Sequence, residues 1–158
     1  MNRPIPDHLW DILVPRGAAE SETEVTGTLR CTCGGEEFAV LESNERRIVR
    51  AVCRQCGREA VLFDAGKHGW DGFVCGFDPL DRTEIAEKFR CPVCGGEHYA
   101  VTVHIASQGK ADFVRFLKES ESSFTEEDWV NAFEWITVSL RCTNCGRRDS
   151  RWLDCETM

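Results

Sequence analysis

The sequence lacks any long hydrophobic run. No apolar stretch in its 158 residues approaches the ~18 residues that a membrane-spanning helix needs. The first residues, Met1 to Asp7, also lack the apolar core of a secretory signal peptide. We therefore expect a cytoplasmic chain with no membrane partner. Because thiols are kept reduced in the cytoplasm, the ten cysteines favour metal binding over disulfides.

Net positive charge is also absent. The formal charge is -8, and any metal ion held by several cysteine thiolates would make it more negative. This charge opposes non-specific attraction to nucleic acid or to an anionic membrane. The local charge differs, because residues 46–58 contain no acid and residues 141–151 contain only Asp149. The arginines of the first stretch are Arg46, Arg47, Arg50, Arg54 and Arg58.

Eight of the cysteines stand in four close pairs, and a glycine follows each pair directly. Cysteines one or two residues apart direct both thiolates into one turn, where glycine takes a backbone angle that a side chain resists. Four thiolates fill the tetrahedral shell of Zn²⁺ and leave no position for water. The pattern predicts two structural zinc sites, with iron as the less favoured metal. The predicted ligands are Cys31, Cys33, Cys53 and Cys56 for the first ion, and Cys91, Cys94, Cys142 and Cys145 for the second.

The paired cysteines, each pair placed at the tip of a predicted β-hairpin, resemble the zinc ribbon, a class with rubredoxin-like knuckles of four cysteines per metal. The 19 residues between Cys33 and Cys53 suit that class. One departure is that a single residue separates Cys31 from Cys33, which makes the turn tighter than in Cys-x-x-Cys. The resemblance implies a three-stranded unit over residues 25–64 that depends on metal for stability, because its core is small.

A second unit nearly repeats the first, since residues 90–101 match residues 30–40 in their Arg-Cys, Cys-Gly-Gly-Glu and Ala-Val segments. The match predicts an internal duplication. The second unit differs in the 47 residues between its two cysteine pairs. Phe113, Phe116 and Leu117 share a helical face there, and Thr125 precedes an acidic first turn. We therefore expect a small, metal-stabilised, mostly β fold of two tandem three-stranded zinc ribbons, the second with an inserted α-helical hairpin at about 108–135.

The chain divides into three predicted parts. Residues 1–24 form an N-terminal arm and linker, whose Trp10 either docks on the body or anchors a partner. Residues 25–80 form the first ribbon with a glycine-rich loop, and residues 81–158 form the second ribbon with the helical insertion. Cys75 and Cys155 are predicted to be core thiols.

Outside the cysteine pairs, the glycine-rich loop at residues 64–73 is the first candidate for a functional surface. It contains His68, Trp70 and Asp71 among three glycines. The alternative is a turn-rich linker whose aromatic residues cover the first ribbon. The sequence offers no nucleophile, base and orienting group in a recognisable set, so we do not expect an enzyme.

We therefore expect a zinc-binding, non-catalytic module with a protein partner. The alternative is a nucleic-acid- or transcription-associated zinc-ribbon factor that uses the arginines near the later cysteine pairs. Net charge disfavours that alternative. The candidate interaction residues are His68, Trp70, Asp71, Arg46, Arg47 and Arg50.

Overall fold

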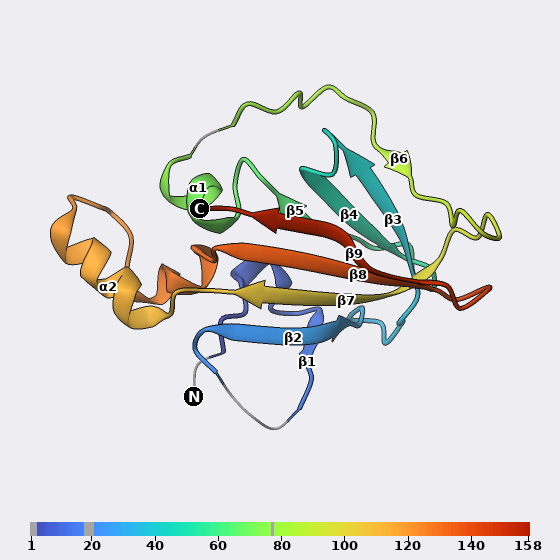
Figure 1. The fold of residues 1–158 in the computed structure, drawn as a ribbon, viewed down its shortest axis with the longest axis horizontal. Helices are drawn as coiled ribbons and strands as arrows, with labels where there is room; N and C mark the ends of the chain where they lie inside the picture. Colours follow the sequence, from blue (N-terminus) through green and yellow to red (C-terminus); the bar gives the residue numbers. More distant parts are fainter. Residues whose placement is uncertain (1–2, 18–20, 77) are drawn as a thin grey trace.

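The computed structural model describes residues 3–17, 21–76 and 78–158, and the described chain is mostly β. Residues 18–20 of the predicted linker lie outside the described residues. Nine strands join in one antiparallel network (Figure 1). The strands are β1 (Leu13–Pro15), β2 (Glu24–Leu29), β3 (Phe38–Ser43), β4 (Ile48–Cys53), β5 (Glu59–Asp64), β6 (Glu87–Lys88), β7 (Tyr99–Ala106), β8 (Trp135–Cys142) and β9 (Arg148–Glu156).

Two three-stranded meanders form the centre of the network, β3–β4–β5 and β7–β8–β9. Both have the same order: a cysteine pair, two strands, a second cysteine pair and a third strand. Their strands pair with each other at one position, Phe38 opposite Tyr99. The predicted mostly β, metal-stabilised class is confirmed, whereas duplication as the origin of the two units stays a prediction.

The strand that precedes each unit's first cysteine pair lies in the other unit. β2 leads into Cys31 but pairs with β7 from Glu24 opposite Ala106 to Thr28 opposite Thr102. In return, β6 leads toward Cys91 but pairs with β3. The backbone hydrogen bonds of each lead-in strand are therefore satisfied by the neighbouring unit. This exchange ties the two predicted domains, 25–80 and 81–158, together; their independent folding stays a prediction.

One hydrophobic core lies between the meanders. On β7 the β-branched residues Val101, Val103 and Ile105 are buried, while the intervening Thr102 and His104 face solvent. This alternation follows from the two-residue period of a strand. The cluster also includes Val40, Val49 and Phe63 of the first meander and Val138 of the second.

The helical elements gather at the end of the β7–β8–β9 meander that lies away from the cysteine turns (Figure 1). The insertion contains α2 (Lys110–Glu119) and the 3-10 helix η2 (Glu126–Asn131), as the expected helical pair. The N–H of Thr125 donates to the Asp128 carboxylate at 2.8 Å and closes the start of η2. A second apolar cluster, centred on Phe113 and Trp129, joins the insertion to α1 (Gly69–Val74).

The N-terminal arm docks on the body through a 3-10 helix, η1 (Asp7–Leu9), and through β1, which pairs with β2. Leu9 and Leu13 are buried in the main core. Trp10 does not dock, since 66% of its surface is exposed. Within the described residues, no helix has the length and apolar character required to cross a membrane.

Candidate metal centres

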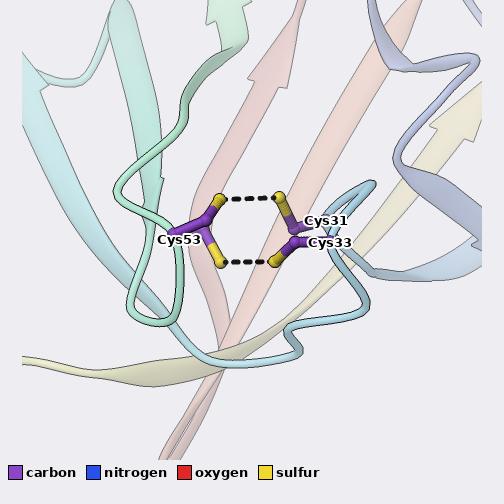
Figure 2. A group of neighbouring side chains, drawn as sticks. Cys31, Cys33 and Cys53 are labelled. Atoms are coloured by element: carbon purple, nitrogen blue, oxygen red, sulfur yellow. Dashed lines mark hydrogen bonds between the residues drawn. The ribbon is translucent and has the colours of Figure 1, made fainter.

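The eight predicted ligands converge in two groups of four, as the spacing predicts. Each group takes one pair from the turn before a meander and one from the turn between its second and third strands. The sulfur atoms of Cys31 and Cys56 are 3.5 Å apart, and those of Cys33 and Cys53 are 3.6 Å apart. Figure 2 shows Cys31 and Cys33 pointing toward Cys53 from the facing turn.

The second group repeats this geometry. Cys91 and Cys145 are 3.6 Å apart at sulfur, and so are Cys94 and Cys142. A disulfide would require about 2.05 Å, and all ten cysteines are free. Four sulfurs at about 2.3 Å from a tetrahedral ion are about 3.8 Å apart. The observed spacings are close to that value, so each group can hold one metal ion.

Glycines allow the turns to close around the sulfurs. Gly34 and Gly95 have φ of +93° and +74°, which side chains resist. The next residue in each turn donates its N–H to a ligand: Gly35 to Cys33 at 3.4 Å and Gly96 to Cys94 at 3.3 Å. A Cβ on Gly35 would lie 2.7 Å from the Cys53 sulfur, whereas on Gly96 it would lie 3.2 Å from the Cys142 sulfur. The first site is therefore the tighter of the two, which fits its shorter Cys-x-Cys segment.

The crowded sulfurs change one another's acidity. The N–H of Cys33 lowers the pKa of Cys31 to about 6. The N–H of Gly35 acts in the same direction on Cys33, but burial and the neighbouring sulfurs raise the pKa of that thiol to about 12. In the second site, hydrogen bonding from Asn144 contributes most to lowering the pKa of Cys94 to about 6. One thiolate therefore opposes ionisation of the next, and a bound cation would remove that conflict.

The glycine-rich loop brings together residues that the sequence did not pair. His68 stacks on His8 of the arm, with ring centres 3.6 Å apart and planes 6° apart. His8 Nε2 donates to the Leu62 carbonyl at 2.9 Å, while His68 Nδ1 accepts the Asp64 N–H at 3.0 Å. Burial lowers the pKa of His8 to about 4 and that of His68 to about 3. Both rings are therefore neutral near pH 7.

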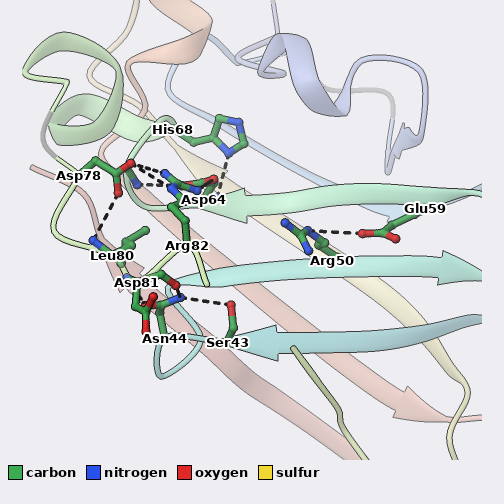
Figure 3. A network of polar contacts seen from close by, with 11 residues as sticks. Ser43, Asn44, Arg50, Glu59, Asp64, His68, Asp78, Leu80, Asp81 and Arg82 are labelled. Carbon is green, nitrogen blue, oxygen red and sulfur yellow. Dashed lines mark hydrogen bonds and ion pairs between the residues drawn. The ribbon is translucent and has the colours of Figure 1, made fainter. Parts of the chain in front are cut away.

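The same turn contains a buried carboxylate, Asp64, that Arg82 holds with bonds of 2.5 and 3.1 Å (Figure 3). Burial by itself would raise the pKa of Asp64, but Arg82 and the Gly66 N–H bring it below the usual range. Arg82 also binds Asp78 at 2.7 Å. The segment after α1 is thus fastened to the end of β5. No sequence spacing indicated this contact, because it joins residues 18 apart through a loop.

The other two loop candidates have different environments. The Trp70 ring packs against Phe113 and Phe116 of the insertion, with ring centres 6.4 and 5.1 Å away. The loop aromatics therefore cover the helical insertion, which differs from the predicted packing on the first ribbon. The Asp71 side chain is exposed, and its N–H donates to the Thr157 carbonyl at 2.7 Å.

Two of the three candidate arginines of the first unit, Arg46 and Arg50, already bind other residues of the chain. Arg46 stacks over Trp152, donates to its carbonyl at 2.6 Å and binds Glu42. It ends a turn in which three successive residues have positive φ. Asn44 fastens that turn to Asp81 (Figure 3). Arg50 binds Glu59 at 3.4 Å, whereas Arg47 is exposed.

The two remaining cysteines are not both in the core. Cys75 is exposed at the end of α1, so its predicted core position is wrong. It follows a helix of only six residues and is not part of the apolar cluster that Trp70, Phe73 and Val74 join. Cys155 on β9 is half-buried and packs against the main core. Burial raises its pKa.

Comparison with protein-family models, with curated proteins and with solved structures finds no match in any of the three.

Proposed function

We propose that both sites hold Zn²⁺ and that the metal is structural. Two clusters of four sulfurs at near-tetrahedral spacing support this proposal. Thiolates alone favour zinc or iron, and four of them leave no position for a substrate or water. Elemental analysis of purified protein should give about two zinc ions per chain. One ion per chain, or the visible absorption of iron–thiolate, would contradict the assignment.

We further propose that the chain is a non-catalytic protein-interaction module of the cytoplasm. Exposure of Trp10 is the observation that carries the interaction role. It lies in an arm whose neighbouring leucines are buried, yet 66% of its own surface faces solvent. A large aromatic side chain on a well-anchored segment is typical of a residue that contributes strongly to an interface.

Trp10 lines a groove of about 440 Å³ between the arm and the helical insertion. The other apolar residues that line this groove are Ile5, Trp129 and Val130. Asp7 fixes one wall, since its carboxylate accepts the Asn131 amide at 2.9 Å. The groove is therefore formed by two elements that the fold holds together, and we propose that an apolar side chain of the partner occupies it.

The groove itself is lined by two bases, Arg3 and Lys110, and two acids, Asp7 and Glu127, whereas the helical insertion beside it is acidic on balance. Residues 107–134 contain seven acids and three bases. Glu126 and Glu127 are exposed and have no ion pair within the described parts of the chain. A partner segment with basic residues on either side of its apolar anchor would complement this surface. We therefore propose a basic, apolar-anchored segment of another protein as the occupant.

Co-purification from the native host with matched variants tests this function. Trp10→Ala should remove a stoichiometric partner and Glu127→Lys should weaken its binding, whereas Val93→Ala should retain it. Val93 is the matched control because it is also exposed, by 69%, and lies outside the groove. Cross-links from the partner should map to basic residues near an apolar one. A partner that survives both groove variants would contradict the proposal.

The nucleic-acid alternative stays a prediction. A salt-sensitive gel shift that is lost when Arg46, Arg47 and Arg50 are substituted would favour it over the protein partner. Among those three, Arg46 is the least available for phosphate, because it is stacked and hydrogen-bonded within the chain. An enzyme that uses His68 and Asp71 is not proposed. His68 already binds through Nδ1 to the backbone.

A further inference from the structure

A second groove, of about 460 Å³, lies on the solvent face of the sheet formed by β2, β7, β8 and β9. Its floor contains three hydroxyl side chains in one row across neighbouring strands. Thr28 lies opposite Thr102, and Thr102 lies opposite Ser139. Ala100 also lines the groove from β7, so small side chains leave space above the sheet. The volume falls in the range of small-molecule sites, about 300–1,000 Å³.

Arginines form the walls of this groove. Arg141 and Arg148 lie directly opposite each other on β8 and β9, and both are exposed. Like charges in that position repel each other and destabilise the pair. Within the described parts of the chain, neither arginine has an ion pair or a side-chain hydrogen bond. Arg16 enters from the opposite side, where its guanidinium donates to the Thr102 hydroxyl at 3.2 Å.

Two carboxylates also line the groove, Glu36 and Asp149, and within the described residues neither forms an ion pair with Arg141 or Arg148. Glu36 already accepts two bonds from Arg30, at 2.9 and 3.1 Å. Asp149 accepts the backbone N–H of Arg151 at 3.3 Å, which keeps its carboxylate turned toward its own strand. Three guanidinium groups, with five N–H donors each, therefore surround a hydroxyl-lined floor. That arrangement matches the several acceptor oxygens of a phosphate group.

The first unit provides an internal comparison. When the two units are aligned on their cysteines, Arg148 corresponds to Glu59 and Ser139 corresponds to Arg50. In the first unit, Glu59 and Arg50 bind each other at 3.4 Å. The second unit has an arginine where the first has the neutralising glutamate, and a small hydroxyl where the first has the long side chain. The small Ser139 leaves space in the groove, and the exchange of glutamate for arginine at position 148 removes the negative charge that the first unit has at this place.

We propose that this groove binds a small phosphate-bearing molecule. Arg16, Arg141 and Arg148 bind the phosphate oxygens, and the Thr28 and Thr102 hydroxyls contact the ligand from below. The other end of the same sheet is acidic, with Glu24, Asp154 and Glu156 at the strand ends away from the arginines. An extended nucleic-acid strand along the sheet would meet those carboxylates, whereas a compact anion meets only the arginine end.

Titration of the zinc-loaded protein tests the site, with inorganic phosphate, adenosine monophosphate and a single-stranded oligonucleotide as probes. Backbone amide shifts of Thr28, Thr102 and Ser139 should move and saturate with one of the two small probes. Saturable binding of inorganic phosphate would show that the phosphate group is sufficient for recognition. Higher affinity for adenosine monophosphate than for phosphate would show that the ligand is the size of a nucleotide. An oligonucleotide that binds when neither small probe does would overturn the proposal.

Arg148→Glu is the decisive variant, because it introduces the residue that the first unit carries at the same place. The substitution removes a charge-assisted contact and places a negative charge beside the phosphate, so phosphate binding should weaken by at least about tenfold. Arg16→Ala should weaken it as well. The matched control, Arg115→Glu, makes the same charge change on the exposed side of α2 and should leave binding unchanged. Equal affinity in Arg148→Glu and Arg115→Glu would refute the site.

Discussion

At the scale of single residues, the two metal centres differ at one glycine position. Gly35→Ala places a methyl group 2.7 Å from the Cys53 sulfur, so the knuckle must shift. We expect about a tenfold loss of zinc affinity at the first site, which corresponds to the lower end of overpacking costs. Competition with a chelating dye measures it. Gly96→Ala, with its wider 3.2 Å contact, should lose less, and equal losses would contradict this account.

Among the ion pairs between described residues, that of Asp64 and Arg82 has the most buried carboxylate, since the Asp64 side chain is 6% exposed. Asp64→Asn removes the charge that Arg82 binds and should lower the free energy of unfolding by about 2 kcal/mol. Urea denaturation of zinc-loaded protein checks this value. Arg30→Ala is the control, because both side chains of the Arg30–Glu36 pair are more than half exposed. It should cost at most about 1 kcal/mol, and a larger effect than Asp64→Asn would refute the ranking.

At the scale of elements, the stacked histidines join the arm to the end of β5. Both have a pKa below the ordinary 6.5. Below pH 6.5 the unfolded chain therefore binds protons that the folded chain does not, and the free energy of unfolding falls as the pH falls. The limiting slope is about 1.4 kcal/mol per pH unit for each ring. The charged groups around the rings are Asp7, Asp64, Lys67 and Arg82.

The double variant His8→Gln and His68→Asn isolates this contribution. Glutamine can donate to the Leu62 carbonyl and asparagine can accept the Asp64 N–H, so the backbone contacts are kept. Between about pH 6.5 and 5 the variant should lose less stability than the parent chain, as followed by urea denaturation at each pH with zinc content measured alongside. An unchanged slope would mean that acid acts through the thiolates alone.

At the scale of the whole molecule, we expect the exchange of β2 and β6 to couple the two candidate metal sites. Cys56→Ser removes an exposed ligand of the first site and should reduce zinc from two ions to one per chain. Because β2 pairs with β7, amide protection should fall in β7 as well as in β3 to β5. Hydrogen exchange measures this loss. Cys75→Ser is the control, since Cys75 is exposed and lies outside both clusters.

Unchanged protection of β7 to β9 in Cys56→Ser would show that the two units are independent domains. The coupled outcome would instead show that metal at one site stabilises strands of both.

Local sequence determined the parts of the candidate metal centres. The four close cysteine pairs, the strands of each meander and the helical insertion follow from short-range spacing and periodicity, because a turn or a strand face is set by neighbouring residues. Thr125 at the start of η2 is one such signal. All eight cysteines that the fold brings into the two groups were named from the sequence, because each close pair has the spacing that a metal ion requires; their binding of metal stays a prediction.

Only the tertiary structure decided how the units combine. The pairing of β2 with β7, the stacking of His8 on His68 and the Arg141–Arg148 opposition each join residues through strand register or chain path, which local pattern does not encode. Leu9 and Trp10 are adjacent large apolar residues, yet Leu9 is buried and Trp10 is exposed. Burial and charge neutralisation depend on which surface arrives opposite a side chain, and that is a property of the assembled fold.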